Sequence, residues 1–225
     1  MQEVEQLRHI PLFLLLILIL TSCSVEKKVI LEKPIPGIIS ETLIQKAEKK
    51  YDMSVRNRYE AYNAKLLELQ NSSTEVKLEE INNFFNDVPY ADDIKIWGKK
   101  NYWATPLEFL GKDKGDCEDY VIAKYFALVD LGVESKKLYL SRVKSTRFKR
   151  SHMVLSYYET PSSIPLILDN SNFKIFPADK RKDLTLVYNF NGENLCFTRE
   201  AGHLNNTKVF SKWDTLINNI KINKF

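Results

Sequence analysis

The period of the hydrophobic pattern changes once along this chain, at Gly132, and this change constrains the fold more than any other feature. Before Gly132, apolar residues recur about every four positions, as in the series Leu43, Ala47, Tyr51 and Val55. This is the spacing of an amphipathic helix. After Gly132, apolar and polar residues alternate, which is typical of strands. Helices followed by a mostly antiparallel sheet indicate an α+β domain.

The boundaries of these elements follow from capping and breaking residues. We expect helices over residues 38–70, about 75–86 and 116–132, with Gly132 as the C-terminal cap of the third. An aromatic loop is expected over residues 88–110, and a short closing helix is expected to begin at Ser211. The expected strands are residues 138–143, 152–158, 166–169, 173–176, 184–190 and 195–198.

The N-terminal segment is typical of an exported protein. Its apolar run, residues 12–20, has nine residues, whereas a helix needs about 20 to span a bilayer. Such a run fits the apolar part of a secretory signal peptide. The following LTSC at residues 20–23 resembles the lipobox of bacterial lipoproteins, which implies lipidation of Cys23; Ser24 then implies outer-membrane destination. A plain secreted protein or an uncleaved signal anchor is the alternative.

We therefore expect three segments: a lipoprotein signal peptide at 1–23, a tether at 24–37 with two prolines and a glycine, and one domain at 38–225. The expected location is the periplasm, with a lipid anchor in the outer membrane. The net charge of +4 comes from interspersed residues, and the densest basic stretch, residues 144–150, is interpreted as a solvated loop. Nucleic acid is not an expected partner, because no basic face is evident.

The three cysteines have different expected roles. If Cys23 carries lipid, Cys117 and Cys196 remain, and a disulfide between them is the structural alternative in an oxidising compartment. Cys196 lies in a strand-like run, where it is interpreted as a small buried hydrophobic residue. Cys117 lies among three carboxylates, an unusual place for a structural cysteine.

Cys117 also lies where the third helix is expected to begin, and a helix N-terminus favours the thiolate form of a cysteine. His152 opens one strand and Asp169 ends the next. On adjacent antiparallel strands these two side chains come within reach, which predicts a nucleophile, a base and an orienting carboxylate. Taken alone, a histidine at a strand end or an aspartate before a turn is more often structural, so that alternative stays open.

Three carboxylates flank the thiol: Asp116, Glu118 and Asp119. They fit the first turn of a helix as capping residues. They would also raise the pKa of Cys117 unless a cation neutralises them, and calcium suits such oxygen ligands. Both interpretations stay open from the residues alone.

Three stretches together resemble the bacterial transglutaminase-like cysteine proteinases. They are YWATPLEFLGKDKGDCEDYVIAKY at residues 102–125, SHMVLSYY at 151–158 and LILDN at 166–170, and the similarity extends over about residues 78–192. The resemblance implies a papain-like or transglutaminase-like core, with a catalytic-cysteine helix packed on the sheet. It also implies a triad of Cys117 as nucleophile, His152 as general base and acid, and Asp169 as orienting carboxylate.

The resemblance further implies calcium dependence, with Asp116 and Glu118 as ligands and Asp119 beside them. It implies a specific endoprotease that cleaves a large cell-surface adhesin near its N-terminus and so controls biofilm attachment. An inner-membrane cyclic di-GMP receptor that sequesters the protease is the implied partner. The other function classes are a transglutaminase-type acyltransferase on the same triad and a non-catalytic binding module.

Two smaller expectations concern the surroundings of the thiol. Backbone N–H groups at the helix start would stabilise the oxyanion, with a second donor from the loop at Tyr102 and Trp103. Trp97 and Trp213 are interpreted as core residues, with docking of a partner as the alternative.

Overall fold

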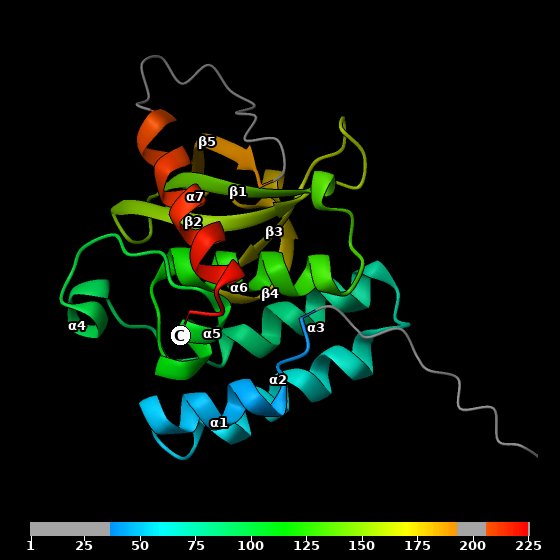
Figure 1. Cartoon of the computed structure of the whole chain (residues 1–225). Helices are drawn as coiled ribbons and strands as arrows, with labels where there is room; N and C mark the ends of the chain where they lie inside the picture. Colours follow the sequence, from blue (N-terminus) through cyan, green and yellow to red (C-terminus); the bar gives the residue numbers. More distant parts are fainter. Residues whose placement is uncertain (1–36, 193–205, 225) are drawn as a thin grey trace, which may run out of the picture. The chain divides into compact units, whose positions relative to one another are not determined.

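A computed structural model describes residues 37–192 and 206–224 of the chain (Figure 1). The helices are α1 (Glu41–Lys50), α2 (Val55–Leu69), α3 (Thr74–Asn86), α4 (Asp93–Trp97), α5 (Pro106–Lys112), α6 (Cys117–Asp130) and α7 (Asn206–Lys221). The strands are β1 (Leu138–Ser145), β2 (Arg150–Tyr157), β3 (Leu166–Asp169), β4 (Asn172–Pro177) and β5 (Leu184–Asn191). Short 3-10 turns, η1 (Ser135–Lys137) and η2 (Ala178–Lys180), precede β1 and follow β4.

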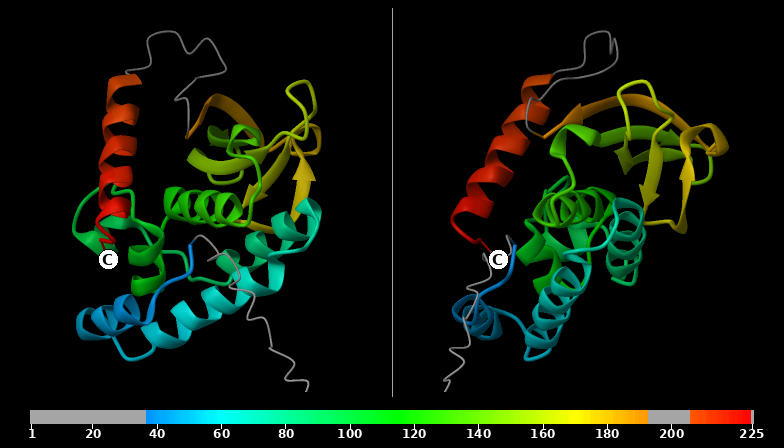
Figure 2. Two further views of the ribbon diagram at one scale, coloured as in Figure 1. Left: turned by 45° about the vertical axis from the view of Figure 1, so that its right-hand side comes forward. Right: turned by 90° about the vertical axis from the view of Figure 1, so that its right-hand side faces the viewer.

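The strands form one antiparallel sheet in the order β4-β3-β2-β1-β5. Helices α1 to α6 precede the sheet in the chain (Figure 2). Helices α3 and α6 pack against the sheet, α5 packs on α6, and α2 and α1 follow beyond α5. The predicted α+β class is therefore confirmed, and so is the change of period at Gly132. This glycine follows the end of α6 with a φ of +84°, a left-handed conformation that glycine adopts without the strain of a Cβ.

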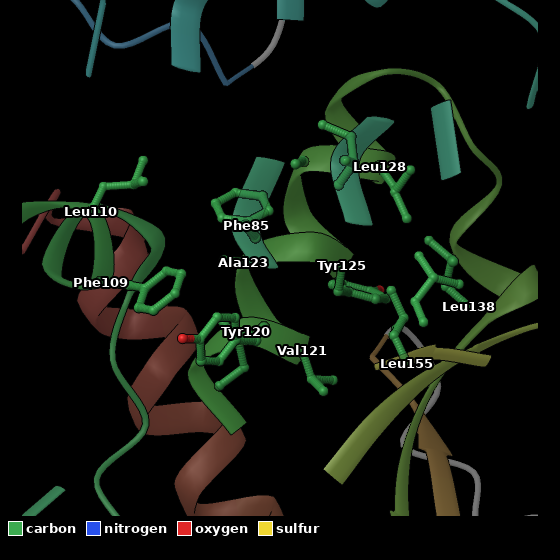
Figure 3. Close-up of a cluster of buried hydrophobic side chains, with 14 of the residues drawn as sticks. Phe85, Phe109, Leu110, Tyr120, Val121, Ala123, Tyr125, Leu128, Leu138 and Leu155 are labelled. Atoms are coloured by element: carbon green, nitrogen blue, oxygen red, sulfur yellow. The ribbon is translucent and has the colours of Figure 1, made fainter. Parts of the chain in front are cut away.

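Helix α6 forms the centre of the core. Most of its residues are buried, and they contact α3 and α5 on one side and the sheet on the other. Figure 3 shows Tyr120 of α6 beside Phe109, with Phe85 nearby, and Leu155 of the sheet on the opposite side. Burial of each such large apolar side chain stabilises the fold by about 1.5–3 kcal/mol. This packing fixes the start of α6 relative to β2.

A buried lysine of α6, Lys124, joins this helix to α3. Lys124 is fully buried, and its ammonium group donates to Asn82 Oδ1 at 2.8 Å and to Asn86 Oδ1 at 2.6 Å, both on α3. Asn86 in turn donates through Nδ2 to the backbone carbonyl of Asp169 at 2.9 Å. The chain of hydrogen bonds therefore runs from α6 through α3 to the end of β3.

Several expected boundaries were wrong. The helix expected over residues 38–70 is two helices, α1 and α2, separated near Asp52; the four-residue spacing continues across the break and conceals it. The loop expected at 88–110 contains α4 and α5. Helix α5 begins with a capping box between Thr105 and Glu108 and with Pro106 at its first position, a recognisable start signal. Helix α7 begins at Asn206, before the expected Ser211.

The tryptophans expected to be core residues differ in burial. Trp213 on α7 is 3% exposed and stacks on Phe126 of α6 with ring centroids 5.9 Å apart, so the docking alternative is wrong for this residue. Trp97 is half-buried. The signal segment, the tether apart from Gly37, Cys23, Cys196 and the strand expected at 195–198 lie outside the described residues. Within the described part of the chain, no helix is both long and apolar enough to cross a bilayer.

The burial of Lys124 predicts a dependence of stability on pH. Burial lowers its pKa to about 7, although the nearby Asp169 carboxylate opposes the shift. The same amine in the unfolded chain titrates near 10.5. Between these pH values the unfolded chain binds more protons than the folded protein, so the free energy of unfolding rises with pH. From pH 7 to 10, the free energy of unfolding of the wild type should rise, relative to that of Lys124→Met, by up to about 1.4 kcal/mol per pH unit.

Urea unfolding at several pH values measures this difference. Lys46 is exposed on α1, so Lys46→Met serves as the control and should run parallel to the wild type. A constant difference between wild type and Lys124→Met across this range would contradict the prediction.

Candidate active site

Cys117 is the first residue of α6, and its position follows from the polar residues around it. Asp116 is the N-cap, and its carboxylate accepts the N–H of Glu118 at 3.3 Å. Asp119 completes a capping box, because its Oδ2 accepts the N–H of Asp116 at 3.2 Å. The expectation of a cysteine in the first helical turn is therefore met, and the helix dipole acts at the thiol.

The same helix start is joined to two preceding loops. Asp119 is buried, and its Oδ1 accepts the N–H of Ala104 at 2.9 Å. Gly115 accepts the N–H of Ala91 at 2.9 Å. A Cβ on Gly115 would lie 2.5 Å from the ring of Phe109, so only glycine fits at this approach. These contacts hold the loops beside the thiol.

His152 and Asp169 are brought together by the pairing of β2 with β3. Leu155 pairs with Leu168, and extending this register by one residue places Asp169 opposite Val154, on the same face as His152. The His152 Nε2 atom lies 2.8 Å from Asp169 Oδ1, and both side chains are buried. The sequence predicted this neighbourhood from the strand ends.

Asp169 is held ionised by its partners. Burial would raise the pKa of this carboxyl, but the His152 hydrogen bond, the N–H of Ser171 and the Arg181 guanidinium hold it well below its usual range. Oδ1 accepts the Ser171 N–H at 2.9 Å, and Oδ2 accepts Arg181 Nη2 at 2.8 Å. Arg181 was missed from the sequence, where it is one basic residue among several after β4.

These contacts determine the tautomer of His152. A carboxylate can only accept, so the Nε2 atom that faces Asp169 carries a hydrogen. In the neutral imidazole, Nδ1 is then the basic nitrogen. Phe148 packs edge-on against the ring, with centroids 5.4 Å apart, and restricts its rotation.

The sulfur of Cys117 lies against β2, beside the backbone N–H of Met153, which follows His152 in the chain. Cys117 is a free thiol. Its hydrogen bond in this structure goes to Glu118 Oε2, at 3.2 Å. No hydrogen bond between Cys117 and His152 is present among the described contacts. In enzymes without substrate, such catalytic bonds are often long and form only in the complex.

The charges around the thiol oppose its ionisation. Burial raises the pKa of Cys117 well above its usual range, and the carboxylates of Glu118 and Asp116 raise it further, against the hydrogen bond from Met153. A thiolate at this position therefore needs positive charge close by.

An acidic cluster lies at the helix start, next to the thiol. Ligand-capable oxygens of Asp93, Asp116 and Asp119 lie within 4.8 Å of one another, and Asp116, Cys117 and Glu118 form a second such group. The three carboxylates predicted as metal ligands are thus divided between two overlapping groups that share Asp116. Asp93, the first residue of α4, was missed because no motif links it to the DCED stretch across more than 20 residues.

The protonation of this cluster reflects burial and crowding. Burial raises the pKa of Asp116 to about 10, with further contributions from Glu118 and Asp119. Burial also raises the pKa of Asp119 well above its usual range, and that of Asp93 to about 6, against a 2.6 Å hydrogen bond from the Tyr102 N–H to Asp93 Oδ2. The other oxygen, Oδ1, is buried and has no partner. An unpartnered buried carboxylate oxygen beside two others fits a hard divalent cation.

Comparisons with known proteins agree with this geometry. Residues 50–186 match the family described as bacterial transglutaminase-like cysteine proteinase, BTLCP. LapG of Legionella pneumophila is 39% identical, covers 80% of this chain and 97% of its own, and superposes with a TM-score of 0.68. Its EGTA-treated form gives a TM-score of 0.69 at the same coverage. Its calcium-bound form gives 0.67, covering 81% of this chain and 99% of LapG. No curated protein sequence matches the chain.

The match spans the helix that bears the thiol and the strands that bear His152 and Asp169. The fold is accordingly of the transglutaminase-like type seen in LapG. This chain belongs to the bacterial transglutaminase-like cysteine proteinases and is a cysteine protease.

Proposed function

We propose that the protein is a calcium-dependent endoprotease with Cys117 as nucleophile, His152 as general base and acid, and Asp169 as orienting carboxylate. The observation that carries this proposal is the buried 2.8 Å contact between His152 Nε2 and Asp169 Oδ1, because His152 lies on β2, the strand against which the Cys117 helix packs. This contact leaves Nδ1 as the nitrogen that can take the thiol proton.

The reaction is acyl transfer to water. His152 Nδ1 takes the proton of the Cys117 thiol, and the sulfur attacks the carbonyl carbon of a peptide bond. The imidazolium then gives the proton to the leaving amine, and a thioester remains. Water, deprotonated by His152, hydrolyses the thioester and restores the thiol. Asp169 stays ionised throughout because Arg181 and Ser171 hold its charge.

The oxyanion requires N–H donors near the sulfur. The start of α6 offers the Cys117 N–H. In the aromatic loop, the N–H groups of Tyr102 and Ala104 are already bound to Asp93 and Asp119. Of the two residues predicted to supply a second donor, Trp103 therefore remains the candidate.

Calcium fits the acidic cluster, and the proposed ligands are Asp93, Asp116, Glu118 and Asp119. Support comes from the unpartnered Asp93 oxygen and from the grouping of the carboxylates, together with the calcium-bound form of the related LapG. When bound, the ion supplies positive charge that lowers the thiol pKa. This charge offsets the carboxylates that otherwise oppose ionisation of Cys117.

The substrate we propose is a large cell-surface adhesin, cleaved near its N-terminus to release cells from a biofilm. The proposed location is the periplasm, with the chain anchored to the outer membrane through Cys23. The proposed partner is an inner-membrane cyclic di-GMP receptor that sequesters the protease. These assignments are supported by the family membership and by the lipobox-like LTSC stretch.

Substitution of the triad tests the reaction. Cys117→Ala and His152→Ala should abolish cleavage. Asp169→Asn should lower kcat by roughly 10²- to 10⁴-fold, because the imidazole loses its orienting charge. Asp87→Asn, at an exposed carboxylate after α3, should cleave like the wild type. The assay follows N-terminal fragments of a large adhesin by mass spectrometry, with and without an added amine acceptor.

The products distinguish the competing functions. Hydrolysed fragments support the protease, whereas amine-linked products in place of hydrolysis would indicate a transglutaminase. Equal cleavage by Cys117→Ala would reject the nucleophile, and the absence of any reaction on folded wild-type protein would favour the binding module.

Substitution of Asp93, the proposed ligand that the sequence did not predict, tests the calcium site. Calcium at 100 times its Kd should stabilise the wild type by about 2.7 kcal/mol, which corresponds to a rise in Tm of several degrees for a chain of this size. EGTA should reverse this rise and abolish cleavage. Asp93→Asn should weaken calcium binding at least tenfold in calorimetric titration, since it removes one charged ligand. Asp87→Asn is the matched control. Unchanged calcium affinity in Asp93→Asn would exclude this residue as a ligand.

A further inference from the structure

A groove of about 860 Å³ lies beside the proposed active site. It is bordered by the loop before α5, by β1 and the start of β2, by β5 and by α7. Its lining contains six cationic side chains, contributed by several separate elements: Lys100, Arg142, Lys144, Lys149, Arg150 and Lys212. The basic stretch interpreted from the sequence as a solvated loop therefore forms one side of a concave surface.

The charge of this groove is one-sided. No acidic side chain of the residues that the structure describes lines it, although the chain has 29 acidic residues against 33 basic ones. Among the described residues, only Arg150 of the six has an ion pair, with Asp92 at 3.7 Å. By contrast, some lysines outside the groove are ion-paired, as Lys65 is with Glu80 at 2.9 Å. The groove thus concentrates positive charge, and within the described part of the chain five of its six cations have no ion pair.

The groove also offers apolar surface. Trp103 and Tyr188 line it, and the ammonium group of Lys212 lies 5.4 Å from the centroid of the Trp103 ring. Lys212 Nζ donates to the backbone carbonyl of Asn101 at 2.9 Å, which fixes this charge in the groove. Aromatic side chains with fixed cations suit a polypeptide that carries acidic side chains.

A bulge in the sheet shapes the groove. Arg142 pairs with Tyr188 and Val143 pairs with Leu186, so Val187 is an extra residue in β5. Val187 and Tyr188 both line the groove, whereas regular alternation would place neighbouring strand residues on opposite faces. Bulges redirect side chains in this way and are frequent beside active sites.

The position of the groove relates it to the thiol. Ser151 lines the groove and directly precedes His152. Trp103 precedes Ala104, whose N–H is bound by Asp119 at the start of the Cys117 helix. The charge of Arg150 interacts with Cys117, and that of Lys212 interacts with Glu118. The groove therefore offers a path for a polypeptide that reaches the thiol.

We propose that this groove binds an acidic segment of the polypeptide substrate next to the scissile bond, so that the enzyme selects sites flanked by aspartate or glutamate. The inference rests on the proposed protease function of the same site. A polypeptide is favoured over an anionic lipid surface because the cations converge in a concave groove beside the nucleophile. A flat membrane would meet exposed lysines on a convex face.

Binding without turnover tests this inference separately from catalysis. The probes are two labelled 20-residue peptides of glycine, serine and alanine, one with six aspartates and the other with six asparagines at the same positions. Fluorescence anisotropy is measured with Cys117→Ala in calcium, at low and at physiological salt. The aspartate peptide should bind at least tenfold more tightly at low salt, and the difference should decrease as salt screens the charges.

Charge reversal locates the binding site. Lys100→Glu with Lys144→Glu changes two exposed groove residues on different elements and should weaken binding of the aspartate peptide about tenfold. Lys46→Glu with Lys49→Glu makes the same change of net charge on the exposed face of α1 and should leave binding within about twofold. Circular dichroism and Tm confirm that both proteins are folded. In the wild type, the aspartate peptide should also slow alkylation of Cys117.

Each remaining outcome overturns the inference. Equal binding of the two peptides would do so, as would equal losses in the two double variants or unchanged alkylation of Cys117 with peptide bound. Binding of phosphatidylglycerol vesicles through Lys100 and Lys144, without binding of the peptide, would assign the groove to lipid. Because Cys117→Ala is used for binding, failure of cleavage in the triad experiment leaves this test unaffected.

Discussion

The buried carboxylate of Asp119 connects the parts of the proposed site, because each of its two oxygens accepts a hydrogen bond from a different segment of the chain. One completes the capping box that begins α6 at Cys117. The other binds the N–H of Ala104 and so fixes the aromatic loop to the helix start. Asp119 also lies with Asp93 and Asp116 in the acidic cluster. The helix start that bears the thiol, the aromatic loop and the candidate cation site therefore share one anchoring residue.

Groups of both charges lie near the thiol. The carboxylates of Glu118 and Asp116 raise the pKa of Cys117. Lysines and arginines line the nearby groove, and the charge of one of them, Arg150, interacts with the sulfur. Opposite fields within a few side chains of the nucleophile orient a substrate of asymmetric charge. The reactivity of the thiol therefore depends on any cation that neutralises the carboxylates of the acidic cluster.

The sequence predicted the α+β class, the strand that follows Gly132 and the meeting of His152 with Asp169, because these depend on local period and on strand ends. It did not predict Asp93 or Arg181. Each reaches the site from a loop or short helix through tertiary packing, and neither belongs to a local motif. The α1–α2 break was concealed because its spacing imitates one helix. The capping box of Thr105 and Glu108 is visible in the sequence and indicates the start of α5, within the segment expected to be a loop.

The link from Lys124 through Asn86 to the carbonyl of Asp169 connects the nucleophile's helix to the strand end that carries the orienting carboxylate. Sliding α6 along the sheet would separate the fully buried Lys124 amine from the two amides that bind it, which would leave a polar group unpaired in the interior. The position of the Cys117 helix relative to the strand end that bears Asp169 is thus coupled through hydrogen bonds in the interior of the protein.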